Sequence, residues 1–181
     1  MIMMPEDRNL FLKTHLDLLF FVGLKKKVFP SSTSMSMYLK TDTQTKFICR
    51  QEMYKDVEII DEYLASNFDH LDENEISIIN GLKKRDEGDF MILKCLQRHA
   101  VFISLDTENV YSVGAISDPF TFFFDYFPVI VTTILIPFKN YIIYDGFFQS
   151  KNIRFGSGIR HSFNDIYKAA KRNKQIISYL A

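Results

Sequence analysis

The sequence predicts an α+β fold, with N-terminal helices, then an antiparallel sheet or partly closed barrel of about five or six strands, then a C-terminal helix. Three observations support this. Residues 1–88 carry apolar side chains at helical spacing, whereas residues 89–155 consist of short apolar runs separated by turn signals. Helical spacing returns at the end of the chain. Helices and strands do not alternate, which argues against a parallel sheet.

The length and composition are those of a globular protein. The chain has 181 residues, near the typical size of one domain, and 47% of them are hydrophobic. Eighteen Phe and nine Tyr, with no Trp, predict an aromatic-rich core and argue against a disordered chain. We expect a helical region over residues 1–88, which could form a subdomain, and an antiparallel β region over residues 89–181 that the last helix closes.

The first helix is expected over residues 6–24. Its apolar residues recur at helical spacing along one face: Leu12, Leu16, Leu19 and Phe20. Gly23 is expected to end this helix, since glycine is common just after a helix C-terminus. Residues 28–46 contain Pro30 and many Ser and Thr but few apolar residues, so we expect a loop or linker there, which could end in an irregular helical turn.

Two more helices are expected in the N-terminal region. An apolar stripe predicts the second over residues 47–68. The third is expected to begin after Asp72, because Asp72 and Glu75, three residues later, fit a capping box. Gly88 is expected to mark the exit from this helix.

Short strands and a final helix make up the rest of the chain. Strands are expected over residues 90–96, 99–105, 110–117, 129–136, 141–144 and 147–155. Residues 120–127 are expected to form a short helix against the sheet, and Asp145-Gly146 a tight turn. The final helix is expected to begin at Ser162, with Asp165 at its third position. Its apolar face would be formed by Phe163, Ile166, Tyr167, Ala170, Ile177 and Leu180.

The second half of the chain carries a series of spaced motifs. They are Pro137-Phe138, Ile142–Gly146, Phe155–Ile159, Tyr167 and Ala170-Lys171. From about Leu71 to Lys171, this pattern resembles a widespread family of uncharacterised bacterial proteins. The resemblance implies a self-contained folding unit, and it brings no established activity with it.

Charge is unevenly distributed, although the formal net charge is zero. Between Glu52 and Glu75 there are nine acidic residues and one basic residue, Lys55. Between Lys151 and Lys174 there are seven basic residues and one acidic residue. Solvated faces, or faces that dock on each other within the fold, are the simplest explanation. The alternative is that the basic last helix binds an acidic partner or nucleic acid.

Asp145 and His161 are weak candidates for catalysis. Asp145 could act as a general base or hold a metal, but an Asp-Gly turn explains it more simply. A site built from Asp145, His161 and Asp165 would require these residues to converge in space. The four His and two Cys match no metal-ligand spacing, so we expect no metal and no cofactor.

The bend at Gly156-Ser157-Gly158 is the best candidate for anion binding. Its backbone amides could hold a phosphate, with Arg154 and Arg160 beside them. The spacing matches neither a P-loop nor a dinucleotide-binding fingerprint, however. A simple bend before the last helix is therefore the more economical explanation.

The hypothesis that we favour is a non-catalytic interaction domain. It would bind a protein partner, or a copy of itself, through its aromatic-rich sheet and the basic residues of the last helix: Lys168, Lys171, Arg172 and Lys174. One alternative is a small hydrolase or nuclease acting on a phosphate-bearing substrate. Another is nucleic-acid binding by the last helix, which an acidic face nearby would oppose. We expect no membrane span, and a cytoplasmic location fits the two unpatterned Cys.

Overall fold

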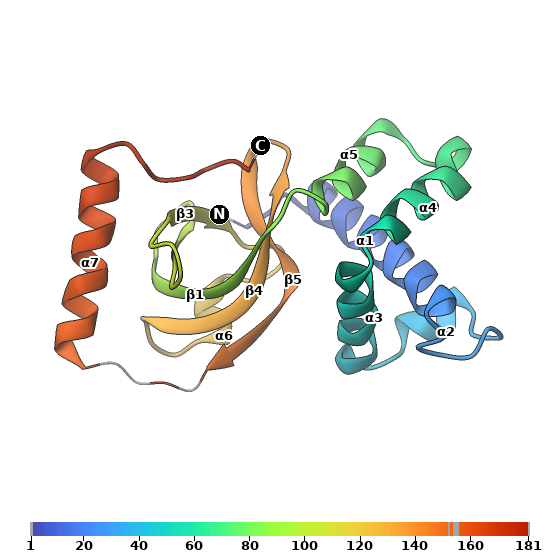
Figure 1. Cartoon of the computed structure of the whole chain (residues 1–181), viewed down its shortest axis with the longest axis horizontal. Coiled ribbons are helices and arrows are strands. Elements are labelled where there is room, and N and C mark those ends of the chain that lie inside the picture. The colour runs from blue at the N-terminus through green and yellow to red at the C-terminus, as the bar shows by residue number, and fades with distance from the viewer. Residues whose placement is uncertain (1, 152, 154–155, 181) are drawn as a thin grey trace. The chain divides into compact units, whose positions relative to one another are not determined.

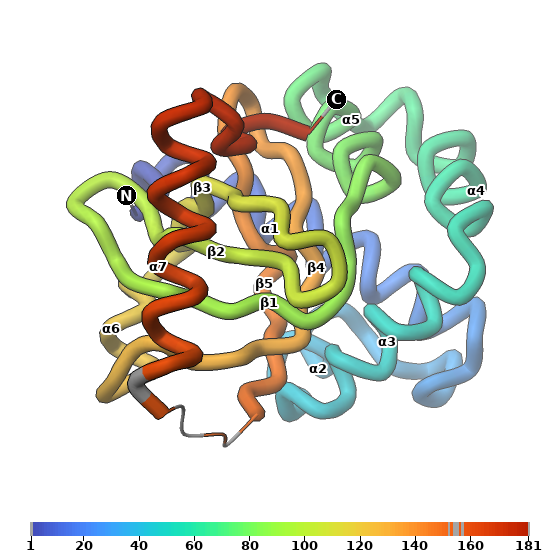
Figure 2. The backbone as a smooth tube through the Cα atoms, turned by 60° about the vertical axis from the view of Figure 1, so that its left-hand side comes forward, coloured from blue at the N-terminus to red at the C-terminus, as the bar shows by residue number. Residues whose placement is uncertain are grey.

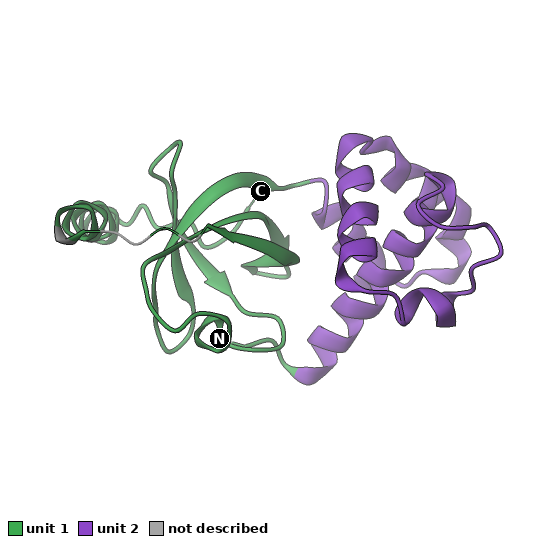
Figure 3. Ribbon diagram, turned by 90° about the horizontal axis from the view of Figure 1, so that it is seen from below, with its two compact units in different colours: residues 1–4, 84–181 green, residues 5–83 purple. Residues whose placement is uncertain are grey.

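The chain folds into two compact units. The structure is a computed structural model that describes every residue except 1, 152, 154–155 and 181. Residues 5–83 form a helical unit, and residues 1–4 with 84–181 form a β unit, so the division falls a few residues before Gly88 (Figures 1 and 3). Helices precede the strands and a helix follows them, which confirms the α+β prediction.

Five α-helices and one short 3-10 helix form the helical unit. They are α1 (Pro5–Lys25), α2 (Met35–Leu39), α3 (Thr43–Lys55), α4 (Glu58–Asn67), η1 (Phe68–His70) and α5 (Glu73–Gly81). Proline at the first position and acidic residues in the first turn favour the start of α1, and Lys25 suits its negative end. The buried face of α1 includes Phe11, Leu18 and Val22, a face displaced from the predicted one.

Gly23 does not end α1 but lies buried inside it. A Cβ atom at this position would stand 2.3 Å from the ring of Phe29 and 2.9 Å from the Sγ atom of Cys49. Both distances are too short for a real contact. The glycine is therefore required for close packing, so that Phe29 can lie against the helix.

The segment between α1 and α4 differs from the prediction in two ways. The segment 28–46, expected to be a loop or linker that could end in a helical turn, contains the whole of α2 as well as the start of α3. Its Tyr38 is fully buried beside the rings of Phe20 and Phe29. The expected single helix over residues 47–68 is two helices. Its backbone leaves the helical region at Asp56, where φ is −136° and ψ is 81°.

The capping box predicted at Asp72 is confirmed. The Asp72 carboxylate accepts a hydrogen bond from the Glu75 amide at 2.9 Å, and the Glu75 carboxylate accepts one from the Asp72 amide at 3.1 Å. These bonds satisfy amides that have no partner within the helix. The helix that follows, α5, ends at Gly81, and Gly88 instead lies in the first strand.

Among the described residues of the β unit, five strands form a curved sheet. The elements are β1 (Asp86–Cys95), β2 (Ala100–Ser104), β3 (Val110–Gly114), α6 (Phe120–Phe123), β4 (Val129–Phe138), β5 (Tyr141–Lys151) and α7 (Ser157–Arg172). The strands are hydrogen-bonded in the order β1-β2-β3-β5-β4, and β4 also pairs with β1, so the sheet curls into a barrel-like ring. Of the strand pairs that the structure describes, β3–β5 alone is parallel, and it joins two residue pairs. The sheet is therefore mixed, not wholly antiparallel.

Both faces of β1 and β2 are covered. Inside the curled sheet, the side chains of Phe90, Phe102 and Tyr111 pack together. The centroid of the Phe90 ring lies 6.3 Å from that of Phe102 and 5.8 Å from that of Tyr111. Outside it, α7 crosses these strands (Figure 2). Its apolar face packs on a cluster that includes Met91 and Val101. Burial on both sides explains the continuous apolar runs at residues 90–93 of β1 and 100–103 of β2.

The last helix begins earlier and ends earlier than predicted. Its N-cap residue is Gly156, and Ser162, the predicted cap, lies inside α7. After Arg172 the chain becomes extended, and Ile177 forms a parallel bridge with Tyr111 of β3. Ile177 and Leu180 therefore do not belong to the helix. In the described part of the chain, no helix is both long and apolar enough to cross a bilayer.

Candidate interaction surface

Asp145 lies in the middle of β5 and is fully buried. Thr133 pairs with Phe148 and Leu135 with Tyr144, so residues 145–147 of β5 face a single residue of β4. This β-bulge, not a turn, accommodates Gly146 at a φ of 96°. The Asp145 carboxylate accepts a hydrogen bond from the Phe147 amide at 3.3 Å. The predicted turn is therefore wrong, although the glycine is needed for its positive φ.

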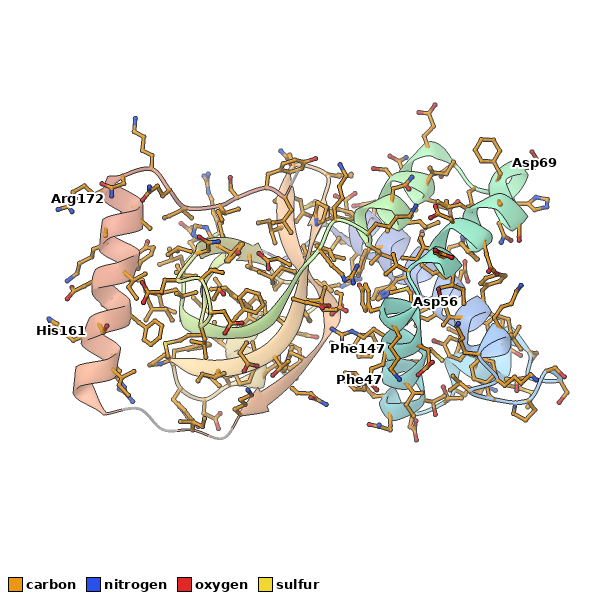
Figure 4. All side chains as sticks on the ribbon, in the orientation of Figure 1. Phe47, Asp56, Asp69, Phe147, His161 and Arg172 are labelled. Carbon is orange, nitrogen blue, oxygen red and sulfur yellow. The ribbon has the colours of Figure 1, made fainter. Side chains whose placement is uncertain are left out.

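His161 lies on α7, far from the bulge. Its side chain is exposed, with Nε2 4.0 Å from the Asp165 carboxylate, to which Lys168 also donates a hydrogen bond at 3.2 Å. Figure 4 shows His161 at the side of the β unit that α7 forms, and Phe147, the last residue of the bulge, at the opposite side. The structure does not bring the two catalytic candidates together.

The candidate anion site is only partly described. Gly156 and Gly158 are exposed, and a Cβ atom at either position would meet no atom within 4 Å. Arg160 is exposed in the first turn of α7, whereas Arg154 lies outside the described residues. A side chain would fit at either position, so packing does not explain these glycines. The simplest explanation of the bend is that it starts α7.

The basic residues of the C-terminal segment face solvent. Tyr167 and Ala170 point toward the sheet, and the Nζ atom of Lys94 lies 4.2 Å from the centre of the Tyr167 ring. The residues predicted to bind a partner are all exposed: Lys168, Lys171, Arg172 and Lys174. Together they form a basic outer face at the C-terminal end of α7.

An exposed group of aromatic side chains surrounds α6. Phe122 is 73% exposed, Phe123 41% and Tyr126 37%. The half-buried side chains of Phe124, Phe127 and Phe148 complete this group, and we call all six the aromatic surface. Large exposed apolar patches on folded proteins mark interaction sites, whereas a single exposed Phe needs no explanation.

Ring contacts connect the aromatic surface with the core. Phe123 contacts Phe148 at 5.3 Å between ring centroids, and Phe148 contacts Tyr144 at 5.7 Å. Tyr144 in turn contacts Phe120, which is buried against Phe102. Burial, with the charges of two nearby aspartates, raises the pKa of Tyr144 to about 12. This chain of rings supports Phe123 from the core, and preorganised side chains of this kind favour binding.

A pocket of about 230 Å³ also lies in the β unit, near the β1–β2 turn. Its lining includes Cys95, Gln97, His99 and Phe120. Burial raises the pKa of the Cys95 thiol and lowers the pKa of His99. A thiol with a raised pKa stays protonated at neutral pH and is a poor nucleophile. The pocket therefore contains a cysteine and a histidine, but its cysteine lacks the lowered pKa of an activated catalytic thiol.

No protein family, curated protein or solved structure matches the chain. The motif resemblance of residues 71–171 to a bacterial family therefore stays a prediction. Within the described residues, no three His, Cys, Asp or Glu side chains are grouped so that they could hold a metal ion.

Sequence reasoning missed the aromatic surface. The run from Phe120 to Phe127 has six aromatic residues among eight, and we interpreted it as a helix packed on the sheet. Only residues 120–123 are helical, and only Phe120 of that turn is buried. The density of aromatic residues could have predicted this exposure, because a helix of eight residues cannot bury six large rings on one face.

Proposed function

We propose that the protein is a non-catalytic interaction domain that binds a second copy of itself through the aromatic surface. The observation that supports this most strongly is the group of three exposed rings, Phe122, Phe123 and Tyr126. Phe123 contacts both Phe122 and Phe148, and Phe148 connects it to the buried aromatic chain. Aromatic residues are enriched at protein interfaces and dominate their binding energy. Burying one such side chain fully is worth about 1.5–3 kcal/mol.

The charges of the two units favour a copy of this chain as the partner. The helical unit has 13 acidic and 10 basic residues, and the β unit has nine acidic and 12 basic residues. One chain thus carries a net negative unit and a net positive one. A second copy offers the complement of each, which would orient the encounter of the two chains.

The two other hypotheses have less support. A hydrolase would need Asp145 to meet its substrate, but that side chain has no exposed surface. Nucleic-acid binding through α7 is favoured by its exposed basic residues and opposed by the acidic helical unit. If labelled DNA or RNA is not retarded at low salt, this alternative falls. We place the protein in the cytoplasm, where its two free cysteines would stay reduced.

Size-exclusion chromatography with light scattering, over a series of protein and salt concentrations, tests the proposal. We expect the wild type to associate as its concentration rises, and to associate less at high salt because salt screens the opposite charges. The double variant Phe122→Ser, Phe123→Ser should remain monomeric. Phe68→Ser is the matched control, since Phe68 is 64% exposed on the helical unit. A monomeric wild type under all conditions, or association that survives in the double variant, would refute the proposal.

A further inference from the structure

The helical unit, drawn in purple in Figure 3, consists of residues 5–83. It contains a groove of about 440 Å³, within the size range of small-molecule sites. It runs along α1 and is closed by residues of α4 and η1. Its lining includes Lys13, Asp17, Phe20, Phe21, Tyr63 and His70. The groove lies wholly within one unit and takes no part in the aromatic surface.

The walls of the groove are aromatic because of the spacing of residues on α1. Asp17, Phe20, Phe21 and Leu24 recur at helical spacing and so share one face. The ring of Phe21 meets that of Tyr63 edge-on at 5.3 Å. Phe20 and Phe21 are only half-buried, which leaves parts of both side chains open to a ligand.

The chain's own lysine shows that a cation can occupy this surface. The Nζ atom of Lys25 lies 5.5 Å from the centre of the Phe21 ring and 3.2 Å from the Glu62 carboxylate. An aromatic face carries partial negative charge and attracts ammonium groups. The pairing of a ring with a carboxylate is thus already used here to hold an ammonium group.

The charged end of the groove has an excess of carboxylate. The Nζ atom of Lys13 lies 2.6 Å from the Glu75 carboxylate and 3.4 Å from that of Asp17, so one ammonium group serves two carboxylates. The hydrogen bond with Glu75 is the main reason that the pKa of Lys13 is raised, and Lys13 therefore stays protonated. One negative charge remains, because this group carries two carboxylates and one ammonium. An anionic ligand would meet an ammonium group that is already paired.

We propose that this groove binds an organic cation, a primary alkylammonium compound whose ammonium group lies at Asp17 and whose apolar body packs on Phe20, Phe21 and Tyr63. The carboxylate supplies charge, the ring faces supply cation–π attraction, and Leu24 with the aromatic side chains covers the hydrocarbon. A neutral ligand of the same shape gains only the burial of its hydrocarbon. The carboxylate and the ring faces would repel an anion.

Titration of the full chain with three six-carbon probes, followed by two-dimensional ¹H–¹⁵N NMR, tests this proposal. Hexylammonium, hexanol and hexanoate have equal length and differ in charge. We expect hexylammonium to shift the resonances of groove residues and to bind about fivefold more tightly than hexanol. Hexanoate should bind most weakly. Acetyl-lysine methylamide distinguishes two sources of the ammonium group, a lysine side chain of a peptide and a free amine. If this capped lysine binds more tightly than hexylammonium, the ligand is a peptide side chain.

Variants separate the charge from the rings. Asp17→Asn should weaken hexylammonium binding about threefold to fivefold and leave hexanol binding nearly unchanged. Phe21→Leu should weaken the binding of hexylammonium more than that of hexanol, because only the ammonium loses a cation–π contact. Asp61→Asn is the matched control, because Asp61 is an exposed acidic residue of α4 that pairs with Lys83 and does not line the groove. Equal affinity for hexanol and hexylammonium, no shifts at groove residues, or an Asp17→Asn variant that binds as the wild type does would overturn the proposal.

Discussion

Phe120→Ala is expected to lower the free energy of unfolding of the β unit by about 3–5 kcal/mol, the usual range for a buried Phe replaced by Ala. Phe120 is 3% exposed, and its ring contacts Phe102 at 5.2 Å and Tyr144 at 5.4 Å. Truncation would leave a cavity between these rings. Phe122→Ala, two residues along the chain and 73% exposed, should change stability by less than about 0.5 kcal/mol.

Hydrogen exchange of strand amides with and without urea measures this difference. It reports on the β unit alone, which matters because the two units need not unfold together. Phe120→Ala and Phe122→Ala replace the same residue type in the same helix, so the two variants differ in the burial of the side chain that is removed. Equal stabilities of Phe120→Ala and Phe122→Ala would show that α6 is not anchored in the ring, and the aromatic surface would then lose its rigid support.

Acidification below about pH 6.5 is expected to destabilise the helical unit through His15. This residue lies on α1 and is 4% exposed. Burial, followed by the charge of Arg50, lowers its pKa from 6.5 to about 3. In the unfolded chain His15 takes up a proton near pH 6.5, whereas in the folded unit it stays neutral to about pH 3. The unfolded state therefore binds more protons in this interval, and stability falls as the pH falls.

The expected loss is up to about 1.4 kcal/mol for each pH unit below 6.5, or about 2 kcal/mol at pH 5. Urea unfolding of wild type and His15→Gln across a pH series, monitored by helical circular dichroism, gives the difference directly. Carboxylates that pair in the fold titrate alike in both proteins and cancel. His70→Gln, which changes an exposed histidine of the same unit, is the control. A wild-type slope equal to that of His15→Gln would contradict the account.

Much of the fold follows from local sequence. The α+β order, the short strands and the capping box at Asp72 all depend on spacing and on capping chemistry that are visible in the chain. What failed depends on contacts between distant residues. Gly23 resembles a helix terminator, and only the ring of Phe29 against it explains why it stays helical. The parallel β3–β5 pair arises from ring closure, which no local pattern encodes.

The candidate site was harder to predict for the same reason. The Asp145-Gly146 sequence is as compatible with a tight turn as with a bulge. The register of β4 against β5 decides between the two. Ser162 and Asp165 fit a helix start, but the helical geometry already begins beyond Gly156. The exposure of Phe122 and Phe123 follows from α6 being a single turn, which buries Phe120 alone.

Photo-crosslinking from the aromatic surface itself provides the decisive measurement. The purified protein carries p-benzoylphenylalanine in place of Phe122, and a matched sample carries it in place of Phe68. If the surface binds a second copy, irradiation should give a covalent species of twice the chain mass from position 122 and little from position 68. Mass spectrometry would then locate the crosslinked residue in the other chain. Equal yields from both positions, or only monomer from position 122, would contradict self-association through this surface.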